Sequence, residues 1–87
     1  MTPTDDTPVT VEALLQAVVA AGGDVSAIYV GAGNPEDRYA IVNTFDAWQV
    51  YYSEKGQKLK FKAFRSEADA CAYAMVLLRA DQTVWRQ

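Results

Sequence analysis

The sequence predicts an α+β fold in which a four-stranded antiparallel sheet is flanked by an N-terminal and a C-terminal helix, in the order α-β-β-β-β-α. Apolar residues recur at helical spacing near both ends of the chain, the pattern of helices with one buried face. Between these regions lie segments rich in β-branched and aromatic residues, which is typical of strands. The links are short, and short links favour an antiparallel meander with both helices on one face of the sheet.

The chain is long enough for one domain. Its 87 residues are 51% hydrophobic and 22% charged, which is an ordinary globular balance, and a domain of this size has a thin core. Residues 1–9 contain two prolines and two aspartates. We therefore expect a flexible N-terminal tail over residues 1–9 and a single domain over residues 10–87.

The first helix is expected to start near Val11 and to end at Ala21. Thr10 can accept a hydrogen bond from the first turn as an N-cap. Gly22 and Gly23 supply the stop, because glycine tolerates the left-handed backbone that ends many helices. The apolar residues at helical spacing are Leu14, Leu15, Val18, Val19 and Ala21.

Four strands are expected to follow, with limits set by the turn residues between them. A hairpin is expected at residues 54–57, where Gly56 tolerates a positive φ. Residues 31–37 have the composition of a loop, and residues 45–46 that of a tight turn or a bulge. The expected strands are residues 25–30, 38–44, 47–53 and 58–64.

The last strand alternates apolar and lysine side chains, so its two faces can be assigned. Leu59 and Phe61 are expected to point inward. Together with Trp48 and Tyr52 of the preceding strand, Phe61 would form an aromatic core between the sheet and the helices. The side chains expected to point outward are Lys58, Lys60 and Lys62.

The second helix is expected to run from its N-cap, Ser66, to Ala80. Asp69 follows three residues after the cap and suits the positive end of the helix. Cys71 lies on the apolar stripe of this helix. We expect it to be a buried small hydrophobic residue.

No combination of side chains in the sequence supports catalysis. The chain has no histidine, which is the commonest general base and metal ligand, so Cys71 has no base to activate it. Gly31 and Gly33 follow a strand but lack the third glycine and the Lys-Ser/Thr pair of a phosphate-binding loop. We expect no cofactor and no metal, and we interpret the chain as a binding module rather than an enzyme.

Location and charge complete this interpretation. A single cysteine allows no intrachain disulfide, and neither a signal peptide nor a membrane span is evident, so the cytosol is the expected location. Residues 1–37 carry six acids and no lysine or arginine, whereas residues 38–87 carry eight basic residues and five acids. Such asymmetry concerns partners and electrostatic steering rather than the fold.

The basic residues around the last strand have two interpretations. Lysines beside tyrosines can bind nucleic acid, and lysines on an edge strand also discourage two sheets from pairing. The chain as a whole is acidic, which favours the second interpretation. A nucleic-acid-binding or regulatory module that uses Lys58, Lys60 and Lys62 stays the alternative function, and a small-molecule-binding subunit of an enzyme is a third.

Two blocks of sequence resemble a pattern found in small bacterial immunity proteins. Residues 48–56 are WQVYYSEKG and residues 64–73 are FRSEADACAY, similar to W-x-V-Y-Y-S-E-[RK]-G and F-x-S-E-x-x-A-C-x-Y. The chain departs mildly by carrying Lys55 where arginine is frequent. Members also begin with a helix, so the resemblance spans most of the chain. It is to the partners of polymorphic toxins, notably NAD(P) glycohydrolase toxins similar to the tuberculosis necrotizing toxin.

The resemblance implies a non-enzymatic inhibitor that binds its cognate toxin in the cytosol of the producing cell. We expect the two proteins to form a heterodimer in which this chain blocks the active site of the toxin. The acids of residues 24–37 suit a cationic cleft, such as one that holds dinucleotide phosphates, and complementary charge raises the association rate. We expect contacts from the loop after the first strand and, secondarily, from the hairpin. The expected contact residues are Asn34, Glu36, Asp37, Arg38 and Tyr39, followed by Tyr51, Glu54 and Lys55.

Overall fold

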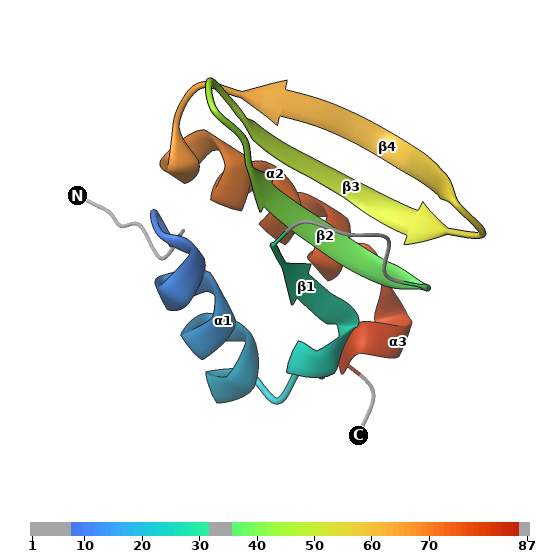
Figure 1. Ribbon diagram of the computed structural model, residues 1–87. Helices are drawn as coiled ribbons and strands as arrows, with labels where there is room; N and C mark the ends of the chain where they lie inside the picture. Colours follow the sequence, from blue (N-terminus) through green and yellow to red (C-terminus); the bar gives the residue numbers. More distant parts are fainter. Residues whose placement is uncertain (1–7, 32–35, 86–87) are drawn as a thin grey trace.

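The computed structural model describes residues 8–31 and 36–85, which form a four-stranded mixed sheet with helices packed against it (Figure 1). The strand order is β1-β2-β3-β4, and the α+β class is confirmed. The predicted tail lies almost entirely outside the described residues. In chain order the elements are α1 (Val11–Ala20), the 3-10 turn η1 (Val25–Ala27), β1 (Ile28–Val30), β2 (Arg38–Asn43), β3 (Trp48–Glu54), β4 (Gln57–Phe64), α2 (Glu67–Arg79) and α3 (Gln82–Trp85).

The first strand differs from the prediction in length and in direction. Residues 25–27 form η1 because Asp24 Oδ1 accepts hydrogen bonds from the Ser26 N–H (3.0 Å) and hydroxyl (2.6 Å), and such local bonds compete with a strand. β1 runs parallel to β2, with Ile28 opposite Tyr39, so the prediction of an entirely antiparallel sheet is wrong. Because β1 has only three residues, the chain has to return over only about 10 Å to begin β2 in the same direction. A short connection can span this distance.

The other three strands form the predicted antiparallel meander. The β2–β3 turn is closed by Thr44, whose N–H and hydroxyl both donate to the carbonyl oxygen of Ala47 at 2.8 Å. The β3–β4 turn has positive φ at both central residues, 52° at Lys55 and 77° at Gly56. Two such residues make the turn whose twist matches that of the flanking strands.

A β-bulge in β4 breaks the predicted alternation of faces. Val50 lies opposite Lys62, and Tyr52 lies opposite Leu59, so three steps along β4 match two steps along β3. Lys60, with a φ of 58°, lies inside this interval and takes the left-handed conformation found in one class of bulge. One extra residue moves every side chain on one side of the bulge to the opposite face.

The bulge changes which side chains of β4 face α2. Phe61 stacks on Tyr51, with ring centroids 5.9 Å apart, on the face of the sheet away from α2, and it is 44% exposed. Lys62 lies on the α2 side, with Nζ 5.0 Å from the ring centroid of Tyr73. The predictions of an inward Phe61 and an outward Lys62 are therefore wrong. Leu59 does share the face of Tyr52, but it stays 38% exposed.

Both predicted helix caps are confirmed, whereas the helix placement is only partly as expected. Thr10 Oγ1 accepts from the Ala13 N–H (3.1 Å), and Ser66 Oγ accepts from the Asp69 N–H (3.0 Å). α2 crosses β2, β3 and β4, while α1 packs mainly beside α2 and η1 (Figure 1). Of the described helices, α2 therefore covers most of the sheet.

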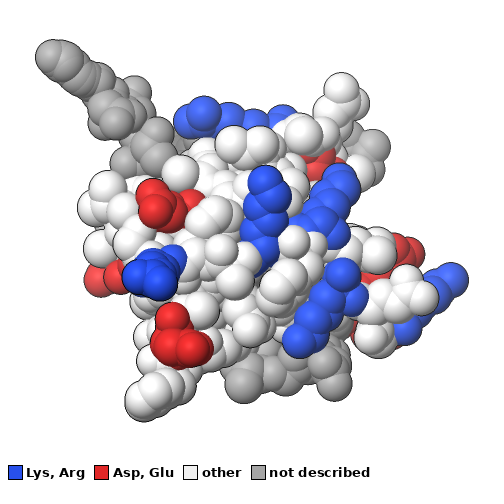
Figure 2. Space-filling view, turned by 90° about the horizontal axis from the view of Figure 1, so that it is seen from above, with Lys and Arg blue, Asp and Glu red and all other residues white. Residues whose placement is uncertain are grey.

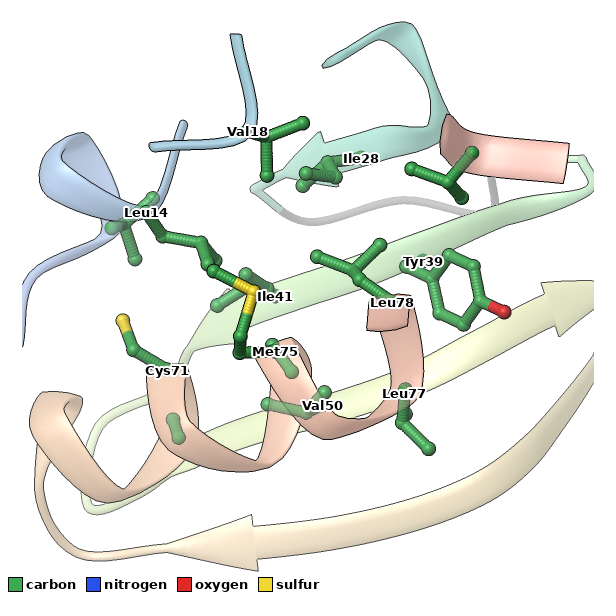
Figure 3. Packing of buried hydrophobic residues seen from close by; sticks show 14 residues of the cluster. Leu14, Val18, Ile28, Tyr39, Ile41, Val50, Cys71, Met75, Leu77 and Leu78 are labelled. Carbon is green, nitrogen blue, oxygen red and sulfur yellow. The ribbon is translucent and has the colours of Figure 1, made fainter. Parts of the chain in front are cut away.

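One cluster of buried side chains joins α1, the sheet, α2 and α3 (Figure 3). Trp48 and Tyr52 pack against this cluster, as predicted. Cys71 is fully buried, which confirms its predicted place, and burial raises the pKa of its thiol to about 11. The thiol is therefore protonated at neutral pH. The largest fully buried side chains are Leu14, Val18, Ile41, Val50, Cys71, Leu78 and Val84.

The short helix α3 was not predicted, and it closes the core at the C-terminal end. Asp81 Oδ1 starts it by accepting hydrogen bonds from the N–H and the hydroxyl of Thr83. Trp85 Nε1 donates to the Leu78 carbonyl oxygen at 2.7 Å. A Cβ at Gly23 would lie 2.7 Å from the Trp85 ring, so glycine allows the end of α1 to approach α3 closely. Among the described residues no helix is long and apolar enough to cross a membrane.

Candidate functional site

Two segments that are distant in sequence meet at one end of the sheet. Glu36, just before β2, accepts a hydrogen bond through Oε1 from the backbone N–H of Lys55 in the β3–β4 turn at 3.1 Å. Arg38 lies opposite Ser53 in the strand register, which places it beside the same turn. The charged side chains at this end, called here the sheet-end cluster, are Glu36, Asp37, Arg38, Glu54 and Lys55.

The backbone of the sheet-end cluster is held in defined turns. Asp37 has a φ of 55° and Lys55 a φ of 52°, so a left-handed residue shapes each of the two segments. The carboxylate of Glu36 bonds to an amide rather than to an ammonium group. Its hydrogen bond therefore joins the two turns without neutralising its negative charge.

Further carboxylates make this end of the molecule acidic. The pKa of Tyr52 is raised from its ordinary value, first by burial and then by the negative charges of Asp37, Glu54 and Asp81. The pKa of Asp24 is lowered, mainly by hydrogen bonds from Ser26 and to a smaller extent by the charge of Arg38. The carboxylates gathered around the cluster are Asp24, Glu36, Asp37, Glu54 and Asp81, against the cations Arg38, Lys55 and Lys60.

The two tyrosines expected as contact residues lie beneath the surface. Tyr39 is 7% exposed, and its hydroxyl donates to Asp81 Oδ2 at 2.7 Å. Its ring centroid lies 4.8 Å from that of Tyr52. Tyr51 is 3% exposed and is covered on its own face by Phe61. Both tyrosines are therefore buried and expose little surface to a partner, whereas Asn34 lies outside the described residues.

The lysines of β4 do not form a single stripe. Lys58 Nζ lies 5.1 Å from the ring centroid of Tyr51 on one face of the sheet, and Lys62 Nζ lies over Tyr73 on the other. Figure 2 shows lysine and arginine side chains spread over one face of the molecule, with Asp and Glu side chains on the same face. The rings of Tyr51 and Tyr73 each already have a lysine of this chain at cation–π distance.

Sequence reasoning missed an exposed aromatic residue at the opposite end of the sheet. Phe45 is fully exposed in the two-residue turn between β2 and β3. The signal for it was available, because an aromatic residue in a tight turn has no core to enter. On the outer side of α1, Leu15 and Val19 also line a shallow apolar depression. Both features lie outside the sheet-end cluster.

The chemistry open to the site is electrostatic recognition. Among residues 8–31 and 36–85, no group of three or more His, Cys, Asp or Glu side chains could hold a metal ion. No family model matches the chain, and no curated protein or solved structure matches it. The features of the cluster that bear on function are its charge and the hydrogen bond that joins its two segments.

Proposed function

We propose that this chain is a non-catalytic protein that neutralises a secreted bacterial toxin by covering its active site with the sheet-end cluster. The observation that carries the proposal is the hydrogen bond from the Lys55 N–H to Glu36 Oε1, which brings the exposed carboxylates of Glu36 and Asp37 to the end of the sheet where the half-buried Glu54 ends β3. The resemblance of residues 48–56 and 64–73 to immunity proteins suggests an NAD(P)+ glycohydrolase as the toxin, neutralised in the cytosol of the producing cell.

The charge of the cluster supports this choice of partner. An enzyme that binds a dinucleotide has to hold phosphate groups, and cationic side chains commonly do so. An acidic surface complements such a cleft, and complementary charge raises the association rate. Asp37 and Lys55 both have a left-handed backbone conformation, and the hydrogen bond from the Lys55 N–H to Glu36 Oε1 joins the two segments. A preorganised surface loses less conformational entropy when it binds.

The residues of the resembled pattern support the fold more than the binding surface. Ser66 caps α2, Cys71 is buried, and Gly56 occupies a turn position with positive φ. Within the pattern, Glu54 and Lys55 belong to the sheet-end cluster. Specificity for one toxin would then depend mainly on the segment before β2, which lies outside the pattern.

The test is inhibition of an NAD(P)+ glycohydrolase toxin domain, taken from the gene directly upstream of this one where that gene encodes such a toxin. We expect the purified chain to stop NAD+ hydrolysis at a one-to-one ratio and to form a heterodimer. Asp37→Ala and Glu36→Ala should each weaken binding by about tenfold or more, as expected for charges at the centre of an interface. Binding is measured by surface plasmon resonance at two salt concentrations, and the association rate should fall as salt increases.

Two further variants separate charge from position. Glu36→Gln keeps an oxygen that can accept from Lys55 but removes the charge, so a loss of affinity in this variant assigns the effect to electrostatics. Phe45→Ser, at the other end of the sheet, should leave affinity within about twofold. Unchanged affinity in all the acidic variants, or NAD+ hydrolysis by the chain alone, would contradict the proposal.

A further inference from the structure

The outer edge of β4 is an open strand edge. β4 is the last strand in the sheet order, and no strand among the described residues pairs with its outer side (Figure 1). Seven of its eight residues are exposed, and Phe64 is half-buried. Main-chain N–H and C=O groups along such an edge can pair with another extended chain. The edge therefore offers a binding surface that is distinct from the sheet-end cluster.

The charge of this edge selects among the chains that could pair with it. From residue 55 to residue 66 the sequence carries five basic residues and no acid. Figure 2 shows lysine and arginine side chains spread over one face of the molecule. A second copy would bring five more positive charges against them, and like charges opposite each other destabilise a strand pair. An acidic segment would instead be attracted.

The bulge determines how an acidic partner can reach the lysines. Lys58 lies on the face of Tyr51, and Lys62 lies on the face of α2 over Tyr73. The Tyr73 hydroxyl also donates to the carbonyl oxygen of Lys60 at 2.8 Å, so α2 holds the bulge in place. Side chains of an added strand point alternately to the two faces, and only such a strand meets both lysines at once. A nucleic-acid strand carries its phosphates along one line, so it would meet the lysine on one face and not the lysine on the other.

We propose that β4 binds an extended acidic segment of a partner polypeptide by strand addition, with one carboxylate at Lys58 and another at Lys62. Because the bulge places one extra residue between these two lysines, the matching carboxylates are three residues apart in the partner and point to opposite faces. The proposal does not depend on the identity of a toxin, since it uses the edge and not the sheet-end cluster.

The probes are three synthetic peptides with the same amino-acid composition. The first is a Thr/Val-rich peptide with two glutamates three residues apart, and the second has them two residues apart, on one face. The third is the first peptide with alternate backbone amides methylated, which keeps the charge but removes hydrogen-bond donors. We expect the first to bind at least about tenfold more tightly than either of the others, a difference of about 1.4 kcal/mol. Fluorescence anisotropy measures affinity, and amide chemical-shift changes should concentrate in residues 57–64.

Matched variants of the chain complete the test. Lys58→Glu with Lys62→Glu should abolish binding of the first peptide, whereas Arg79→Glu at the end of α2 should not change it. Glu36→Gln should also leave peptide binding unchanged, which separates this surface from the sheet-end cluster. If the methylated peptide bound as tightly as the first peptide, charge attraction alone would explain the binding, and strand addition would be overturned. Tighter binding of oligo(dT) than of any peptide would overturn it in favour of nucleic acid.

Discussion

At the residue scale, the pair of Tyr39 and Asp81 connects β2 to the end of α2. The two residues are 42 positions apart in sequence, and the Tyr39 hydroxyl donates to Asp81 Oδ2 at 2.7 Å. Removing the hydroxyl in Tyr39→Phe should lower the free energy of unfolding at pH 7 by about 1.5–3 kcal/mol, as expected for a hydrogen bond to a charged acceptor. Urea unfolding measures the loss.

The same pair predicts a dependence on pH. Hydrogen bonds from Thr83 and then from Tyr39 lower the pKa of Asp81, so its contribution to stability is present above the unfolded-state pKa and is lost as pH falls through the lower folded-state pKa. The difference between Tyr39→Phe and the original chain should therefore shrink from pH 7 to pH 3. Asp81→Asn closes a double-mutant cycle, and zero coupling between the two substitutions would show that the hydrogen bond contributes nothing.

Single residues were predictable where their role depends on neighbours in sequence. Thr10 and Ser66 cap helices through an amide three residues ahead, and Cys71 follows the apolar stripe of its own helix. The burial of Tyr39 was not predictable, because it depends on a partner 42 residues away. The acidic residues of the candidate site were visible in the sequence, but the contact of Glu36 with Lys55 requires the folded sheet.

At the element scale, the bulge in β4 shows why a clear alternation can mislead. The sequence of this strand alternates lysine and apolar residues without a glycine to mark an irregularity, yet Lys60 has a φ of 58°. A residue with a Cβ pays about 1–2 kcal/mol in this conformation. The direction of β1 was hidden for a different reason, because three residues carry too little pattern to fix their pairing.

The conformation of Lys60 gives a prediction about glycine substitutions within one strand. Lys60→Gly should raise the free energy of unfolding by up to about 1 kcal/mol, because glycine adopts positive φ without strain but loses more entropy on folding. Lys62→Gly, in the same strand without a positive φ, should lower it by about 0.5–1 kcal/mol. Thermal and urea unfolding compare the two. Equal losses in both variants would mean that the bulge is absent in solution.

At the scale of the whole molecule, the two charged surfaces share one support. The sheet-end cluster and the edge of β4 meet at the β3–β4 turn, and the strands that carry them pack on α2. The acids before β2 and the lysines of β4 therefore lie on two adjoining surfaces that meet at this turn. A partner with both a cationic cleft and an acidic segment could engage the two surfaces together, with a gain set by effective concentration.

The shared core predicts that the chain unfolds as one unit. Leu14 of α1 is fully buried in the cluster that also contains Ile41 of β2 and Leu78 of α2. Leu14→Ala should lower the free energy of unfolding by about 2–5 kcal/mol, and helix loss followed by circular dichroism should coincide with the change in tryptophan fluorescence. Val19→Ala, on the exposed side of the same helix, should change stability by about 0.5 kcal/mol or less. If circular dichroism showed α1 melting before the fluorescence change, α1 would be an appendage of the sheet and α2 instead of a part of their core.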